Sequence, residues 1–283
     1  MPFFEAIARM ILIVLALTIC ACSGLLFYPY SQHLRNPRTL GLDYRDVVVQ
    51  TGDNVKIHGW FLPAIGTLKG SVYFLHGNAE NISTHIESVK WLPRQGYQVF
   101  LIDYRGFGLS EGRPFLPEVF LDIKAGFGWL IEHSRNKPVF LLGQSIGASL
   151  GVYFAATNPQ AKRYLAGIIS DSGFTDYFQI ARHAASSFWL TWPFQYPIAW
   201  LMDYPYNAID VIADLAPIPL LICHGKRDEI VPLEHAEQLY HAAKQPKLLL
   251  ITEDGHIQTF INEKNRAFVL NFINRIGAAR RFP

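Results

Sequence analysis

A serine between two glycines stands near the middle of the chain, in the sequence Gly143-Gln144-Ser145-Ile146-Gly147. Such a G-x-S-x-G pattern can hold a serine on a sharp turn from a strand into a helix, with its hydroxyl exposed above a sheet. An apolar run precedes the motif, and a helix-compatible stretch follows until Asn158-Pro159. The pattern predicts a nucleophile at Ser145, in a turn so tight that side chains at either glycine would collide with it. The alternative is an ordinary helix N-cap.

A serine hydroxyl becomes a good nucleophile only when a base takes its proton and a carboxylate orients that base. Asp228 follows an apolar strand through a Gly225-x-x-Asp228 turn, and His256 follows another strand and Gly255. Of the ten histidines, His256 alone combines a strand end, a glycine turn and a place after the acid. The predicted base is therefore His256 and the predicted acid Asp228, with Asp171, at the end of an earlier strand, as the rival acid.

Two backbone N–H groups are needed to stabilise the oxyanion that forms when a serine attacks a carbonyl. The N–H of Ile146, the residue after the serine, is one predicted donor. The second is expected in the loop after an earlier strand, where His76-Gly77-Asn78 offers the N–H of Asn78. The alternative for this Gly-Asn pair is a plain turn.

Five motifs occur in an order that resembles the α/β-hydrolase superfamily. They are His76-Gly77-Asn78, Asp103-Tyr104-Arg105-Gly106-Phe107-Gly108, Gly143-x-Ser145-x-Gly147, Gly225-x-x-Asp228 and Gly255-His256. The resemblance covers residues 44–276, and the Asp103–Gly108 loop is similar to membrane-associated α/β-hydrolase-domain proteins, which include lipid and acyl-thioester hydrolases. This likeness implies a serine hydrolase with the triad Ser145, His256 and Asp228. We expect the Asp103 loop to brace the oxyanion loop, with Arg105 anchoring backbone carbonyls.

Composition narrows the functional class. The 283 residues are 50% hydrophobic and 17% charged with a net charge of +2, which gives no support for nucleic-acid binding. No H-E-x-x-H or paired C-x-x-C motif occurs, and the third glycine of the Gly106 loop is misplaced for a dinucleotide site. We therefore expect no metal and no cofactor. Cys223 stands alone in a predicted strand, so a disulfide framework is excluded.

The first 30 residues form a distinct segment. Residues 10–22 are almost wholly apolar and end in Cys20-Ala21-Cys22, which looks like a bacterial lipobox with Cys22 as the lipidated residue. An uncleaved anchor helix and simple secretion are the alternatives. All three possibilities would place the domain outside the cytoplasm. A lipid anchor or an uncleaved helix would also attach it to a membrane. Phe27-Tyr28-Pro29-Tyr30 suits an interfacial contact.

Strands and helices alternate over residues 31–283, which predicts an α/β fold with a mostly parallel sheet and helices on both faces. The predicted strands are 44–50, 56–61, 71–76, 98–102, 138–143, 165–170, 219–224 and 247–252, and the predicted helices are 83–94, 117–134, 145–157, 232–243 and 257–276. The alternation breaks over residues 174–216, which we interpret as a helical cap. It holds eleven aromatic residues from Phe174 to Tyr206. We expect most of them to pack the cap onto the core and a few to line an acyl pocket.

The combined expectation is a hydrolase of carboxylic esters or thioesters with apolar acyl groups, acting at a membrane through an acyl-enzyme. Two other classes stay open. One is a non-catalytic, membrane-tethered scaffold that binds lipid or a partner, since a fold does not fix a function. The other is an acyltransferase, in which an alcohol replaces water. The sequence does not indicate an oligomeric state.

Overall fold

The structure is a computed structural model that describes residues 26–279. The predicted anchor, with its lipidation residue Cys22, lies outside these residues. None of the helices within 26–279 has the length and apolar character that a membrane crossing requires.

Eight strands form one sheet in the order β10-β9-β8-β7-β4-β6-β3-β2. Their bounds are Arg45–Gln50 (β2), Lys56–Leu62 (β3), Gly70–Leu75 (β4), Tyr97–Ile102 (β6), Val139–Gln144 (β7), Leu165–Asp171 (β8), Leu220–Gly225 (β9) and Lys247–Thr252 (β10). The pairs from β10 to β6 are parallel, and β3 is antiparallel to both β6 and β2. The eight predicted strands are confirmed. Short apolar runs are typical of buried parallel strands such as β4, β6 and β7, whereas β2 alternates exposed and buried residues.

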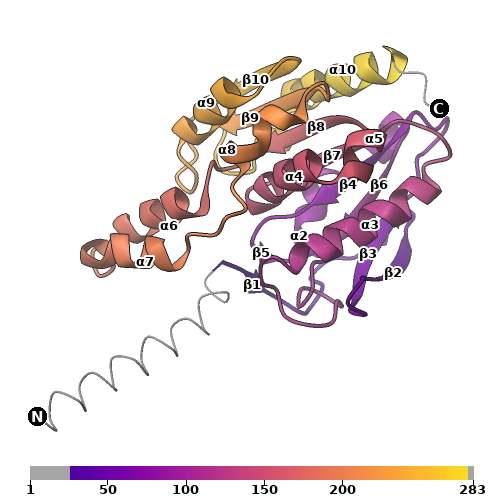
Figure 1. Cartoon of the computed structure of the whole chain (residues 1–283). Helices are drawn as coiled ribbons and strands as arrows, with labels where there is room; N and C mark the ends of the chain where they lie inside the picture. The colour runs from indigo at the N-terminus through magenta and orange to yellow at the C-terminus, as the bar shows by residue number, and fades with distance from the viewer. Residues whose placement is uncertain (1–25, 280–283) are drawn as a thin grey trace, which may run out of the picture.

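Side chains alternate between the two faces of the sheet and build a core on each. Tyr73 and Leu75 of β4 belong to the core under α3 (Val119–His133), α4 (Ile146–Thr157) and α9 (Leu233–Ala242). Val72 and Phe74 belong to the second core, under α10 (Glu263–Ala279). Figure 1 shows α3 and α4 lying across one face, and the predicted covering of both faces is confirmed.

Two predicted helices differ from the structure. The stretch 83–94 is three short pieces, α2 (Ile82–His85), η3 (Ile86–Ser88) and η4 (Pro93–Gln95). The helix predicted from residue 257 begins only at Glu263, after a turn and the short η7 (Thr259–Ile261). An additional helix, α5 (Pro159–Tyr164), starts where α4 was expected to end the helical segment, because proline suits the first turn of a helix.

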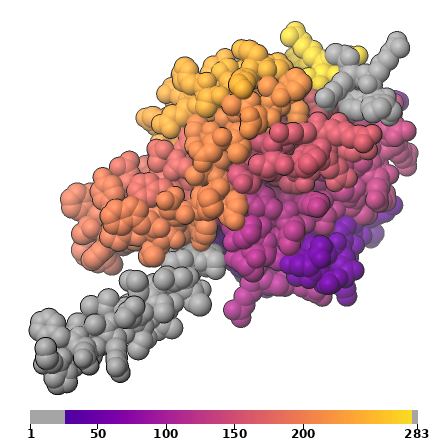
Figure 2. All heavy atoms as spheres, in the orientation of Figure 1, coloured from indigo at the N-terminus to yellow at the C-terminus, as the bar shows by residue number. Residues whose placement is uncertain are grey.

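The segment between β8 and β9 contains α6 (Tyr177–Ser186), α7 (Gln195–Leu201) and α8 (Ala208–Val211), followed by η6 (Ile212–Leu215). Helices α6 and α7 pack on each other and project from the rest of the molecule (Figures 1 and 2). Phe174 and Tyr177 are buried at the base of the segment. Six rings beyond them are 49–77% exposed, namely Phe188, Trp189, Trp192, Phe194, Tyr196 and Trp200. The expectation that most rings pack onto the core is therefore wrong for this stretch.

Residues 28–36, here called the arm, lie along the loop that follows β4. β1 (Tyr28–Pro29) pairs in parallel with β5 (Ala79–Glu80), and η2 (Pro37–Leu40) follows the arm. The side-chain amide of Asn81 donates to the carbonyls of Tyr30 and Gln32, both at 2.8 Å.

The predicted interfacial role of Phe27 is wrong, because Phe27 is buried against the ring of Phe107, at 6.2 Å between centroids. Tyr28 and Tyr30 next to it are exposed. The aromatic run thus divides between a core contact and two surface rings.

Candidate active site

Ser145 occupies the turn between β7 and α4 with φ 54° and ψ −123°, a conformation that costs a residue with a side chain roughly 1–3 kcal/mol. The two glycines make the turn possible. A Cβ at Gly143 would clash with the Gly147 carbonyl, and a Cβ at Gly147 would clash with the carbonyls of Leu75 and His76. The predicted need for glycine is confirmed. Ser145 stands at the N-cap position of α4, but its side chain makes no capping hydrogen bond and its backbone is strained, so it is not an ordinary N-cap.

The structure brings Asp228 and His256 together at the ends of two neighbouring strands. His256 Nδ1 lies 2.8 Å from Asp228 Oδ2. Asp228 Oδ1 accepts the backbone N–H groups of Ile230 at 3.0 Å and Val231 at 2.9 Å. Burial alone would raise the pKa of Asp228, but its hydrogen bond to His256 and the charge of that ring lower the pKa below its usual range. An ionised Asp228 fixes Nδ1 of His256 as the donor and leaves Nε2 as the nitrogen that could act as a base.

The rival acid, Asp171, has other partners. Asp171 Oδ1 accepts the hydroxyl of Thr259 at 2.6 Å, and Oδ2 accepts the amide of Gln144 at 2.8 Å. Burial raises the pKa of Asp171 to about 6. The carboxylate beside His256 is therefore that of Asp228, while Asp171 holds the segment that follows the histidine.

Gln144, next to Ser145, and Ile257, next to His256, are joined by a hydrogen bond. The amide of Gln144 also donates to the carbonyl of Ile257 at 3.4 Å, and the N–H of Ile257 donates to the Ser172 hydroxyl at 3.3 Å. Within residues 26–279, no hydrogen bond joins the Ser145 hydroxyl to His256 itself. Such bonds often close only in the substrate complex. Sequence reasoning missed the positioning roles of Gln144, Ser172 and Thr259, although Gln144 stands inside the serine motif.

One predicted oxyanion donor is the residue after Ser145, and the other follows a glycine that lies against the serine. Ile146 is the first residue of α4, so its N–H belongs to the unpaired group at a helix start. Gly77 lies against the serine, since a Cβ built at Gly77 would stand 3.7 Å from Cβ of Ser145. Asn78 follows it, half-buried, and its carbonyl accepts the N–H of Tyr28 at 2.7 Å. The oxyanion roles of Asn78 and Ile146 stay predictions.

The loop after β6 braces this region, as expected, but through a different residue. Asp103 Oδ1 accepts the N–H of Ile82, just after the oxyanion loop, at 2.8 Å. Arg105 anchors no backbone carbonyl among the described residues. Its guanidinium instead pairs with the carboxylates of Asp122 and Asp53, so its predicted role is wrong. In a buried site, a carboxylate is a stronger hydrogen-bond partner for a guanidinium than a backbone carbonyl is.

A cavity of about 310 Å³ opens beside the histidine loop. His85 and Thr84 line it from the oxyanion side, and Ile257 and Phe260 line it from the histidine side. Its lining residues include none of the exposed aromatic rings of α6 and α7. The cavity therefore lies between α2 and the segment that follows His256, and its lining does not include Ser145, Asp228 or His256.

Known proteins resemble this chain in sequence and in fold. A family model described as serine aminopeptidase, S33, matches residues 66–177. Uncharacterized protein YfhR of Escherichia coli strain K12 is 34% identical over 215 residues, which are 74% of this chain and 72% of that protein. Lysophosphatidylserine lipase ABHD12 of Gallus gallus is 27% identical over 243 residues, 76% of this chain and 63% of that protein. The solved structure of Pyrococcus furiosus esterase Pf2001 has a TM-score of 0.69 and 25% identity, covering 87% of this chain and 98% of that one.

Proposed function

Since this chain belongs to the α/β-hydrolase superfamily and is a hydrolase of that fold, we propose that it cleaves carboxylic esters or thioesters with a Ser-His-Asp triad. Ser145 is the nucleophile, His256 the base and Asp228 the acid that orients it. The backbone N–H groups of Ile146 and Asn78 form the oxyanion hole.

The mechanism follows from these roles. His256 Nε2 takes the hydroxyl proton as Ser145 Oγ attacks the acyl carbon, and the two N–H groups stabilise the negative oxygen. The protonated ring then gives its proton to the leaving alcohol or thiol. Water, deprotonated by the same nitrogen, opens the acyl-enzyme and restores Ser145. Asp228 stabilises the charged ring throughout, at the 2.8 Å distance it already has.

One observation carries this proposal. A serine is held at φ 54° between glycines that tolerate no side chain, and hydrogen bonds to Gln144 and Ser172 hold Ile257, the neighbour of a carboxylate-bound histidine, beside it. A purely structural turn has no use for this strain, because a glycine at position 145 would relieve it. The names of the esterase and lipase relatives support an acyl ester as the substrate class.

We also propose that the substrate is reached at a membrane surface. The rings of the connection between α6 and α7, together with those of α7, form an exposed apolar patch that includes Trp189, Trp192 and Trp200. Tryptophan and phenylalanine are the side chains that favour a bilayer interface. The apolar segment of residues 10–22, with Cys22 as its lipidation residue, would bring this patch to the lipid from outside the cytoplasm.

Replacing the nucleophile tests the catalytic proposal. Ser145→Ala should lower kcat for a short p-nitrophenyl ester by at least about 10⁴-fold, because the triad acts as a unit. It should also abolish labelling by a fluorophosphonate probe while the circular dichroism spectrum stays unchanged. Ser187→Ala, at an exposed serine whose hydroxyl donates to the His183 carbonyl of α6, is the matched control. Unchanged turnover in Ser145→Ala would exclude the serine mechanism, and a native chain that neither turns over esters nor accepts the probe would favour a binding protein.

A further inference from the structure

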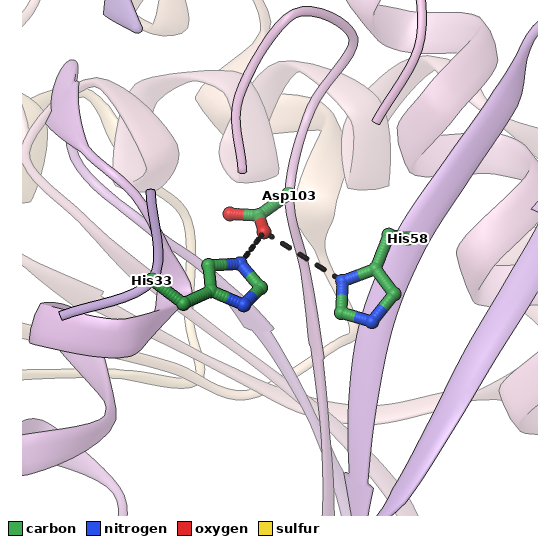
Figure 3. A group of neighbouring side chains, drawn as sticks. All are labelled: His33, His58 and Asp103. Atoms are coloured by element: carbon green, nitrogen blue, oxygen red, sulfur yellow. Dashed lines mark hydrogen bonds and ion pairs between the residues drawn. The ribbon is translucent and has the colours of Figure 1, made fainter. Parts of the chain in front are cut away.

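Three side chains outside the proposed triad converge behind the oxyanion loop. His33 comes from the arm, His58 from β3, and Asp103 directly follows β6. His33 Nε2 lies 2.9 Å and His58 Nδ1 3.8 Å from Asp103 Oδ2, and the three ligand atoms all lie within 4.8 Å of one another. Figure 3 shows both rings turned toward the one carboxylate.

The ring of His58 has an unused nitrogen. Its Nε2 lies 2.8 Å from Asp46 Oδ1, an oxygen that also accepts the indole N–H of Trp60 at 3.0 Å. The hydrogen bond to a carboxylate places the proton on Nε2, so Nδ1 of the neutral ring carries a lone pair. This Nδ1 is buried and has no hydrogen-bond partner among the described residues. A buried Nδ1 that faces a carboxylate oxygen is stabilised by a cation between them, either a proton on the ring or a metal ion.

Gly108 keeps the approach to these atoms open. A Cβ at position 108 would clash with Asp103 Oδ2 and would lie 2.6 Å from His33 Nε2. The glycine is fixed there by its N–H, which donates to the Tyr30 carbonyl of the arm at 3.0 Å. Any larger residue would fill the space next to two of the three converging atoms.

We propose that His33, His58 and Asp103 bind a divalent transition-metal ion of the Zn²⁺ class. Two imidazole nitrogens and one carboxylate oxygen are a donor set that such ions prefer. Asp46 behind His58 is the outer carboxylate that commonly orients a metal-binding histidine. The ligands are spread over 70 residues of sequence, so no short motif reveals them.

The bound ion would join the arm to the sheet and to the oxyanion loop. Asp103 binds the ion through Oδ2 while its Oδ1 holds the N–H of Ile82. The site therefore has a structural role that does not depend on the proposed ester hydrolysis, and its binding can be measured without a substrate.

Metal content of the full-length chain, purified in mild detergent, tests the proposal. The protein is stripped with a chelator, incubated with Zn²⁺, dialysed, and measured by inductively coupled plasma mass spectrometry. We expect about one zinc ion per chain, a raised melting temperature with Zn²⁺, and visible absorption bands when Co²⁺ replaces it. His33→Gln and His58→Gln should each reduce retained zinc to below roughly a tenth, whereas His241→Gln, at an exposed histidine, should retain it.

A milder variant guards against misfolding. Asp46→Asn leaves all three ligands in place and should weaken zinc affinity by about 10–100-fold. If the native protein retains less than about a tenth of an ion per chain, the proposal is overturned. A proton on Nδ1 of His58 would then face Asp103 in place of a metal. The proposal would also be overturned if His33→Gln, His58→Gln and Asp46→Asn each retained as much zinc as the native protein.

Discussion

The turn that carries Ser145 and the helical pair α6–α7 use their side chains in opposite ways. Around the serine, residues 143–152 are buried, and neighbouring backbone leaves no room for a Cβ at Gly143 or Gly147. In the segment 187–201, the large apolar side chains face solvent, with Trp189 at 77% exposure. The contrast indicates that the proposed chemistry rests on a closely packed part of the molecule, whereas the exposed segment is free to contact something outside it.

The largest expected effect separates the two aspartates of the rigid region. Asp228→Asn should lower kcat by about 10⁴-fold, because the ring of His256 loses the partner that fixes its tautomer. Asp171→Asn should lower kcat far less, since its partners are Thr259 and Gln144. Ester turnover by the two variants checks this, and a larger loss in Asp171→Asn would reverse the assignment of the acid.

The close packing at the turn predicts a large effect on stability. Gly147→Ala should reduce the free energy of unfolding by about 3 kcal/mol or more, because its Cβ would meet fixed carbonyl groups. Gly128→Ala on α3 is the control, since nothing lies within 4 Å of a Cβ there. It should stabilise the helix by up to about 1 kcal/mol. Urea unfolding measures the free energy of unfolding of both variants. If Gly147→Ala were as stable as Gly128→Ala, the turn would be able to shift and accommodate a Cβ.

Burial of Asp171 predicts a dependence of stability on pH. Its pKa is raised from 3.8 to about 6, so the folded state favours the protonated form. The contribution to stability is full below about pH 4 and is lost as pH rises through 6, a change of about 3 kcal/mol. Asp228 acts in the opposite sense, because its pKa is lowered. In urea titrations, Asp171→Asn should gain stability relative to the native chain as the pH rises from 4.5 to 7.5. A stability difference between the two proteins that stays constant over this range would contradict the raised pKa of Asp171.

The smallest expected effect concerns the exposed connection between α6 and α7. The double change Trp189→Ser with Trp192→Ser should leave the melting temperature and the hydrolysis of a short soluble ester nearly unchanged, because both rings are exposed. Hydrolysis of a long-chain ester in phosphatidylcholine vesicles should fall about tenfold or more. Val48→Ser, at an exposed valine of β2, should change neither rate. An equal loss on both substrates would mean that these rings belong to the catalytic region after all.

Most strands were predictable because they are short, largely apolar runs that end at a polar residue or glycine, and strand 247–252 was predicted without error. The helix predicted over 83–94 failed because its sequence gives three short turns, one starting at Pro93. The helix expected from residue 257 starts late because Ile257 and Thr259 are used to hold the histidine loop.

Motif order placed the candidate serine, acid and histidine, because the ends of parallel strands meet at one edge of the sheet. Partners that depend on three-dimensional packing were out of reach. Arg105 was expected on backbone carbonyls but found two carboxylates, and His33 approaches Asp103 across 70 residues. The exposure of Trp189 was equally hidden, since composition alone does not distinguish a ring that packs inward from one that faces outward.

The pairing of β1 with β5 has a practical consequence for anyone who shortens this chain to remove its apolar beginning. A truncation point after residue 36 would discard Tyr28, whose N–H binds the Asn78 carbonyl, and would leave the Asn81 amide without its two acceptors. A protein trimmed in that way would lose the support behind its predicted oxyanion donor. A cut just before Leu26 keeps the whole arm and is the safer choice for recombinant work.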